Sequence, residues 1–165
     1  MEDYNDVEVF IEIPRNSRIK YEYDKKRNAL VCDRVLHTPL AYNFNYGFIE
    51  NTLSGDGDAI DVVLLMDDEL APGTFINCRI IGVLLTSDDS GDDPKLIACP
   101  SYKVDPTYTY TDISQVSSHT TDKLKYFFSH YKDLEKKTVT VGEFQGRDSA
   151  IQILEQSKNN WIKNK

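Results

Sequence analysis

A short acidic stretch placed directly before an apolar run constrains this chain more than any other feature. Residues 55–61 read Gly-Asp-Gly-Asp-Ala-Ile-Asp, and residues 62–65 read Val-Val-Leu-Leu. A continuous apolar run of this length is typical of a buried strand. The two glycines allow a tight turn in front of it. We therefore expect three carboxylates to be held at the leading edge of a core strand.

These crowded carboxylates need a positive partner. Asp56, Asp58 and Asp61 lie within six residues, and carboxylates brought that close repel one another. Mg²⁺, a hard cation that takes oxygen ligands, would relieve the repulsion. Taken alone, the stretch fits a solvated acidic turn equally well, because Asp and Gly are common turn formers. A Ca²⁺ loop is a third interpretation, but the EF-hand glycine and closing glutamate are missing from their offsets.

A second acidic cluster repeats this arrangement. Residues 87–95 contain four aspartates, and a strand-like run at 96–99 follows them. An exposed mobile loop is the ordinary interpretation of one such cluster. Two clusters that each precede a strand offer enough oxygen ligands for several cations. The three histidines show no paired ligand spacing, which favours Mg²⁺ over Zn²⁺.

Length, charge and cysteine content limit the class of protein. A chain of 165 residues predicts one domain over 1–165. With a net charge of −8, the chain lacks the basic surface that nucleic-acid binding requires. Three widely spaced cysteines favour free thiols in a reducing compartment. No apolar run reaches the length of a membrane span, and the acidic N-terminus has no apolar signal core. We expect a cytoplasmic protein that binds neither nucleic acid nor membrane.

Hydrophobic periodicity predicts a mainly β chain with two late helices. Strands are predicted at 7–13, 19–23, 29–34, 60–65, 75–85, 96–99 and 138–141, with a loop of packed rings at 42–47. A helix is predicted from about residue 118, with Leu124, Phe127, Phe128, Tyr131 and Leu134 on its apolar face. Asp148 is the predicted N-cap of a second helix.

The mixture of acids, cations and tyrosines indicates an anionic, phosphate-bearing substrate. Phosphoryl transfer uses metals and cations to offset charge, and a positioned base to direct water. Neither a P-loop nor a Gly-x-Ser-x-Gly motif is present. Judged from strand alternation alone, however, Glu12, Lys20, Glu22 and Arg34 are better explained as a solvated sheet face than as a ligand-binding one.

Residues 56–62 resemble the Asp-x-Asp-Pro-x-Asp signature of the soluble family I inorganic pyrophosphatases. Further segments resemble the same family in register, at 10–14, 19–22, 33–34, 45–47, 88–95 and 130–135. The chain departs from the family pattern at Ala59 and Asn43, where proline is usual or frequent. In the family pattern, proline at these two positions stiffens the backbone, and neither position supplies a ligand.

The resemblance implies Mg²⁺-dependent hydrolysis of pyrophosphate to two phosphates by a metal-activated water that attacks in line. Carried over residue by residue, it makes Asp58 the catalytic base. The implied metal ligands are Asp56, Asp61, Asp88 and Asp93, with Glu12 and Glu22 supporting the metal shell. The implied phosphate-binding residues are Lys20, Arg34, Tyr46, Lys95, Tyr131 and Lys132.

The resemblance also implies an architecture. It predicts a small five-stranded OB-like β-barrel with two flanking α-helices, and the compact prokaryotic-type length implies a homohexamer. Two alternatives stay open. One is a non-catalytic OB-like module whose acidic loops hold Ca²⁺, although the acidic charge argues against an oligonucleotide ligand. The other is a Mg²⁺-dependent phosphatase that acts on organic phosphates.

Overall fold

Nine strands and two α-helices make up residues 3–165, the part of the chain that this computed structural model describes. The strands are β1 (Val7–Ile13), β2 (Ile19–Asp24), β3 (Ala29–Val35), β4 (Asn45–Phe48), β5 (Asp61–Leu64), β6 (Phe75–Asp88), β7 (Gly91–Asp92), β8 (Lys95–Pro100) and β9 (Thr140–Gly146). The helices are α1 (Ser118–His130) and α2 (Arg147–Lys163), with short 3₁₀ turns η1 (Ile113–Gln115) and η2 (Asp133–Glu135). Within 3–165, every helix is too short or too polar to cross a membrane.

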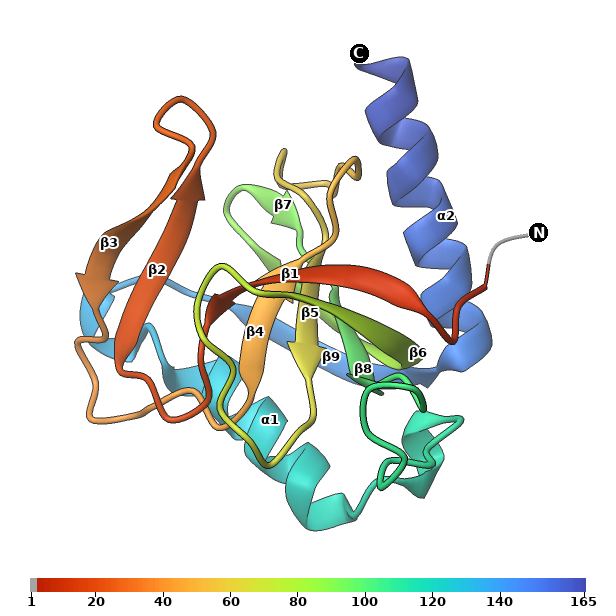
Figure 1. The fold of residues 1–165 in the computed structure, drawn as a ribbon. Helices are drawn as coiled ribbons and strands as arrows, with labels where there is room; N and C mark the ends of the chain where they lie inside the picture. Colours follow the sequence, from red (N-terminus) through yellow and green to blue (C-terminus); the bar gives the residue numbers. More distant parts are fainter. Residues whose placement is uncertain (1–2) are drawn as a thin grey trace.

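Five strands close into a ring (Figure 1). Their order is β1-β4-β5-β8-β6, and β6 pairs back with β1. Only the β5–β8 pair of this ring is parallel. The 14-residue β6 continues beyond the ring and pairs with β7 and β9. The predicted mainly β fold with a five-stranded ring and two helices is therefore confirmed.

Strands β5 and β8 are apolar after their first residues, Asp61 and Lys95, because both of their faces are buried. Side chains alternate between the two faces of a strand, and here each face joins a different core cluster. Val63 and Ile97 belong to the cluster beneath α1. Val62 and Leu96 belong to the cluster that α2 covers. The loops at the strand ends are thereby anchored in the core.

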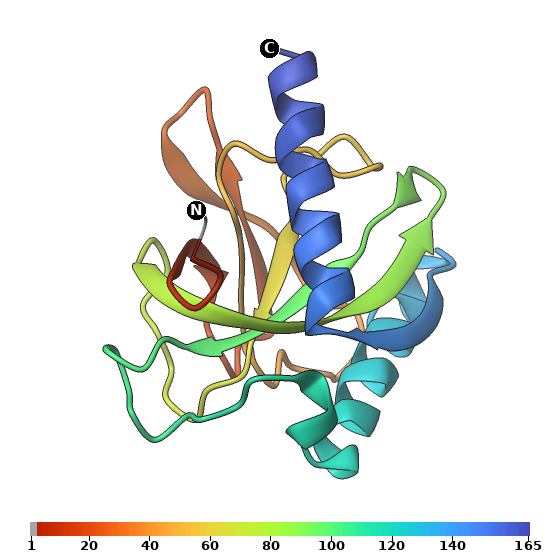
Figure 2. The same ribbon diagram turned by 90° about the vertical axis from the view of Figure 1, so that its right-hand side faces the viewer.

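The two helices cover different parts of the ring (Figure 2). Helix α1 buries Leu124, Phe127 and Phe128, and α2 buries Ala150 and Leu154. These positions repeat at helical spacing, which is why periodicity located both elements.

The predicted helix ends were wrong at two positions. Helix α1 stops at His130, and Leu134 lies in η2 with 64% of its surface exposed. The apolar spacing continues past the point where the backbone leaves the α-helix. Asp148 is not an N-cap, because α2 begins at Arg147 after Gly146. Its carboxylate instead lies in the first turn, where the negative charge interacts favourably with the positive end of the helix dipole.

Two predicted strands and one predicted loop differ from the structure in their extent. Strand β6 runs to Asp88, beyond the predicted end at residue 85, and its pairing register with β8 shifts at Gly82. A Cβ on Gly82 would lie 2.7 Å from the Cβ of Ile113, so close packing explains that glycine. Strand β9 begins at Thr140, and part of the predicted ring-packed loop forms β4.

Strands β2 and β3 form a separate hairpin that stands beside the ring (Figure 1). Lys20 and Arg34 are paired across this hairpin. Its connection to the ring includes a hydrogen bond of 2.8 Å from the Tyr23 N–H to Glu12 Oε2 of β1. The Phe10 and Tyr23 rings also meet, with centroids 5.3 Å apart. The hairpin is thus placed where its polar residues can face the ring.

We expect Gly47→Ala to destabilise the fold by about 3 kcal/mol or more, because overpacking a tight site displaces backbone. A Cβ at Gly47 would lie 1.9 Å from the Phe10 carbonyl oxygen. Gly73→Ala is the matched control. No atom lies within 4 Å of its added Cβ, and only its φ of +89° opposes alanine, at a cost of about 1–2 kcal/mol. Urea unfolding that ranks the two variants equally would contradict this packing argument.

Candidate active site

A cavity of about 290 Å³ lies where the β2–β3 hairpin faces the ring. It is lined by all of the predicted site residues except Arg34. These are Glu12, Lys20, Glu22, Tyr46, Asp56, Asp58, Asp61, Asp88, Asp93, Lys95, Tyr131 and Lys132. The structure thus brings together side chains that lie far apart in the sequence.

Local hydrogen bonds shape the first acidic loop. The Ser54 N–H donates to the Asp58 carbonyl at 2.7 Å, and the Gly57 N–H donates to the Ser54 carbonyl at 3.0 Å. The Asp58 N–H donates to Asp56 Oδ1 at 3.0 Å, which fixes one carboxylate. Gly57 has a φ of +91°, a conformation that favours glycine. The loop therefore presents its acids before β5 begins.

The two acidic segments touch through a pair of glycines. A Cβ on Gly91 would lie 2.6 Å from the Gly55 carbonyl oxygen, and the φ of Gly91 is +127°. The second segment is also pinned to β6, because the Asp93 N–H donates to the Thr86 carbonyl at 2.9 Å. This close backbone approach carries the aspartates of both segments to one side of the cavity.

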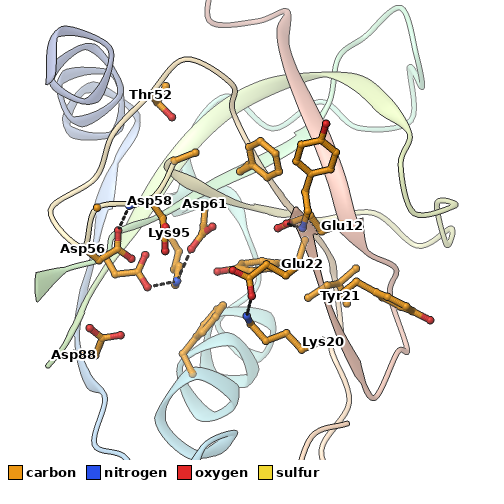
Figure 3. Close-up of a pocket in the computed structure, with 18 of the residues that line it drawn as sticks. Glu12, Lys20, Tyr21, Glu22, Thr52, Asp56, Asp58, Asp61, Asp88 and Lys95 are labelled. Atoms are coloured by element: carbon orange, nitrogen blue, oxygen red, sulfur yellow. Dashed lines mark hydrogen bonds and ion pairs between the residues drawn. The ribbon is translucent and has the colours of Figure 1, made fainter. Parts of the chain in front are cut away.

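A buried lysine sits among these acids. Lys95 is only 3% exposed, and its Nζ lies 2.8 Å from Asp61 Oδ2 and 2.6 Å from Asp93 Oδ2. Figure 3 shows Lys95 beside Asp56, Asp58 and Asp61. Burial opposes its charge, but Asp61 and Asp93 raise its pKa above the usual value. Lys95 is therefore an ammonium. It offsets the negative charge of the aspartates from both acidic segments, which together form the acidic wall of the cavity.

The acidic wall suits a hard cation in its donors but is not a finished ligand cage. Within residues 3–165, no group of three or more Asp, Glu, His or Cys side chains is arranged to hold a metal ion. Asp93 Oδ1 is nevertheless buried without a hydrogen-bond partner, and a buried acceptor of this kind needs a partner. Burial raises the pKa of Asp93, and the charge of Lys95 opposes that shift. An all-oxygen donor set with an orphaned carboxylate oxygen fits Mg²⁺.

The carboxyl groups of the first loop are less acidic than usual. Burial raises the pKa of Asp56 and of Asp58, and the charge of Asp61 adds to both effects. For Asp58 this moves the pKa toward the range in which a carboxylate accepts protons more readily.

Glu12, Glu22 and Lys20 lie across the cavity from the acidic loop (Figure 3). Lys20 Nζ is 3.3 Å from Glu22 Oε2 and 3.8 Å from Asp33 Oδ2. These contacts involve partly exposed side chains, so they add little stability. The lysine is free to exchange partners when an anion enters.

Tyr131 and Lys132 reach the cavity from the end of α1. Burial raises the pKa of Tyr131 to about 12, so its hydroxyl remains a proton donor. Burial lowers the pKa of Lys132, and the nearby charge of Arg34 adds to that effect. Tyr46 is buried on β4, where burial raises its pKa well above the usual value. These groups offer donors for an anion.

Arg34 is the one predicted site residue outside the lining. Its Nε lies 3.0 Å from Glu135 Oε1, and its Nη1 donates to Asp33. Burial opposes its charge, but Glu135 and Asp33 raise its pKa above the usual value. Arg34 is paired across the hairpin with Lys20, which lines the cavity, so Arg34 lies at the cavity edge.

Tyr42 and Trp161 are among the lining residues that were not predicted as site residues. Tyr42 is 1% exposed, and its ring centroid lies 5.7 Å from that of Tyr46. Its aromatic, asparagine-rich segment was a usable signal. Trp161 lines the cavity from the last turns of α2. Its sequence neighbourhood carries no such signal, because only tertiary packing brings α2 to this place.

We expect Glu12→Gln to flatten the pH dependence of stability in EDTA. Burial raises the pKa of Glu12 from 4.5 to about 7. Between these values the folded protein keeps a proton that the unfolded chain has lost, so the free energy of unfolding falls as pH rises. The loss amounts to about 3 kcal/mol across that window. Glu8→Gln, at an exposed position of the same strand, is the control. Parallel wild-type and Glu12→Gln curves from urea unfolding between pH 4 and 8 would contradict the shift.

Comparison with known proteins finds matches to one family over nearly the whole chain. A model of the family described as inorganic pyrophosphatase matches residues 9–162. The chain is 49% identical to an inorganic pyrophosphatase of Helicobacter pylori over 151 residues, which cover 90% of this chain and 87% of the relative. It is 44% identical to that of Nanoarchaeum equitans, with 96% and 99% covered.

Solved structures agree. The inorganic pyrophosphatase of Helicobacter pylori superposes with a TM-score of 0.94 at 45% identity, covering 98% of this chain and 96% of the other. That of Thermus thermophilus superposes with a TM-score of 0.89 at 33% identity, covering 96% and 92%. The resemblance noted in the sequence is thereby confirmed: the chain belongs to the inorganic pyrophosphatase family of hydrolases.

Proposed function

We propose that this protein hydrolyses inorganic pyrophosphate to two phosphates in a Mg²⁺-dependent reaction. The observation that carries the proposal is the cavity itself, which gathers an acidic wall and a set of cationic and hydroxyl donors. Such a division suits a highly charged phosphate anion, because cations offset the phosphoryl oxygens while acids hold metal and direct water. Family membership supports the same reaction.

The acidic wall would hold the metal. Asp56, Asp61, Asp88 and Asp93 are the proposed ligands, with Glu12 and Glu22 supporting the shell from the other side of the cavity. Bound Mg²⁺ would supply charge neutralisation and a lower pKa for coordinated water.

Asp58 would act as the base. Its carboxyl group is exposed to the cavity and has a raised pKa, so it can accept a proton from the attacking water. The water would attack one phosphorus in line with the bridging oxygen, which leaves on the second phosphate. The P–O bond to the bridge breaks as the bond to the water oxygen forms.

The donors of the cavity would hold the substrate. Lys20, Lys95 and Lys132 are point charges, while Tyr46 and Tyr131 contribute hydroxyl donors. Arg34 can bind a phosphate through two N–H groups at once. Together these groups would orient both phosphates and offset the charge that moves to the leaving group.

Asp58→Asn is expected to keep the fold and to lower kcat about 10²–10⁴-fold, because an amide cannot accept the proton of the water. Asp89→Asn is the control, since Asp89 is exposed in the second acidic segment and lies outside the cavity lining. Steady-state phosphate release, with circular dichroism to confirm folding, measures both. Near-normal turnover by Asp58→Asn would overturn the role of this residue.

Phosphate release from pyrophosphate should be fast with Mg²⁺, vanish with EDTA, and fall when Ca²⁺ replaces Mg²⁺. Ca²⁺ is larger and accepts irregular coordination, so it would misplace the attacking water. Parallel assays with organic phosphate monoesters complete the test. Equal rates on monoesters would favour a general phosphatase, and absence of any release by folded protein would favour a binding module.

The assembly is inferred from the family resemblance, and the compartment is inferred from the three free cysteines. We infer a homohexamer that works in the cytoplasm. Size-exclusion chromatography with light scattering should give about six times the 18.9 kDa of one chain, and a mass of one chain would refute the hexamer.

A further inference from the structure

Glu135 makes a buried ion pair that the proposed reaction does not use. Its side chain is 6% exposed, and its Oε1 lies 3.0 Å from Nε of Arg34. Its second oxygen, Oε2, is buried without a hydrogen-bond partner. Surface pairs contribute little, but a buried charge without a partner is costly. The Arg34 guanidinium is therefore the contact that makes this carboxylate tolerable where it lies.

The pair joins two parts of the site that belong to different elements. Arg34 belongs to the hairpin outside the ring, opposite Lys20. Glu135 lies in η2, three residues after Lys132 and directly beyond the end of α1. The contact thus ties the hairpin to the segment that carries Tyr131 and Lys132.

The contact also determines which N–H groups of the Arg34 guanidinium stay available to bind a phosphate. Nε forms an ion pair with Glu135 at 3.0 Å without a hydrogen bond of good geometry, and Nη1 donates to Asp33 of the same strand. A guanidinium has five N–H groups in a rigid planar fork, so fixing two of its nitrogens fixes the plane. The remaining N–H groups can then meet a phosphate without loss of side-chain freedom on binding.

We propose that Glu135 is a positioning residue, which holds the plane of Arg34 at the cavity edge so that the free N–H groups bind a phosphate of the substrate. This role deepens the proposed pyrophosphate hydrolysis and depends on it for the identity of the substrate. Glu135 itself does not touch the substrate. It acts through Arg34 alone, which distinguishes positioning from a separate binding role.

A double-mutant cycle tests this dependence. The variants are Glu135→Gln, Arg34→Ala and their combination, with Glu143→Gln as the matched control. Glu143 also pairs with a cation, Lys125, at 3.0 Å, but its side chain is 85% exposed and it lies outside the cavity lining. The probe is the methylene analogue of pyrophosphate, whose bridge cannot be hydrolysed. Its binding is measured by calorimetry with Mg²⁺ present, beside KM and kcat for pyrophosphate.

Glu135→Gln should weaken binding of the analogue about 10-fold to 100-fold, the range typical for removing a residue that orients a ligand-binding side chain. Arg34→Ala should weaken it at least as much, and adding Glu135→Gln to Arg34→Ala should have no further effect. Glu143→Gln should bind as wild type does. A merely structural Glu135 would lower the unfolding temperature and leave binding unchanged, which would overturn the proposal. Additive losses in the double variant would overturn it too.

Arg34→Lys keeps the test decisive if Glu135→Gln does not fold. Lysine retains the charge but lacks the planar fork, so it should bind the analogue about as weakly as Arg34→Ala. Wild-type affinity in Arg34→Lys would show that orientation is unnecessary.

The two proposals can fail separately. Wild-type protein that binds the analogue with the expected cycle but releases no phosphate would overturn the hydrolysis and leave the positioning role standing. Wild-type protein that hydrolyses pyrophosphate while Glu135→Gln matches it in KM and in analogue binding would overturn only the positioning role.

Discussion

The buried ammonium of Lys95 is the interaction on which the acidic cavity depends. Removing a charge from water is expensive unless it is paired, and Lys95 is paired twice, with Asp61 and Asp93. The same ammonium lets those carboxylates lie close together without mutual repulsion. The parallel pairing of β5 and β8 places Asp61 directly opposite Lys95. The chemistry of the site is therefore built into the strand register of the ring.

The two sides of the cavity are supported in different ways. Most of the acids lie in loops that lead into β5 and β8, strands whose two faces are buried, and the contact between Gly55 and Gly91 locks these loops together. Several of the cations come from the hairpin and from the end of α1, outside the ring. Side-chain contacts such as those of Glu12 and Glu135 hold that half in place. A rigid acidic side and a more adjustable cationic side would suit the proposed reaction, in which an anionic substrate must enter and leave.

The hydrophobic periodicity of the sequence located the main strands and helices, because the burial of particular faces imposes that periodicity. The alternation in β1 and the apolar run of β5 both follow from which faces are covered. Leu134 was misplaced because the spacing does not record where the backbone leaves the helix. For the site, acid spacing alone could not separate a metal site from a turn, and the family resemblance decided between them. Trp161 and Glu135 depend on tertiary contacts that have no local signature.

The parallel β5–β8 pair has a consequence for the order of folding. Asp61 and Lys95 are 34 residues apart, and β6 and β7 lie between them in the chain. Contacts between distant residues form only after loop-closure entropy has been overcome. The clustered acids therefore exist as a cluster only in the native state. A cation that binds them would favour the folded chain over the unfolded one by mass action, so the ions of the reaction would also protect the enzyme against unfolding.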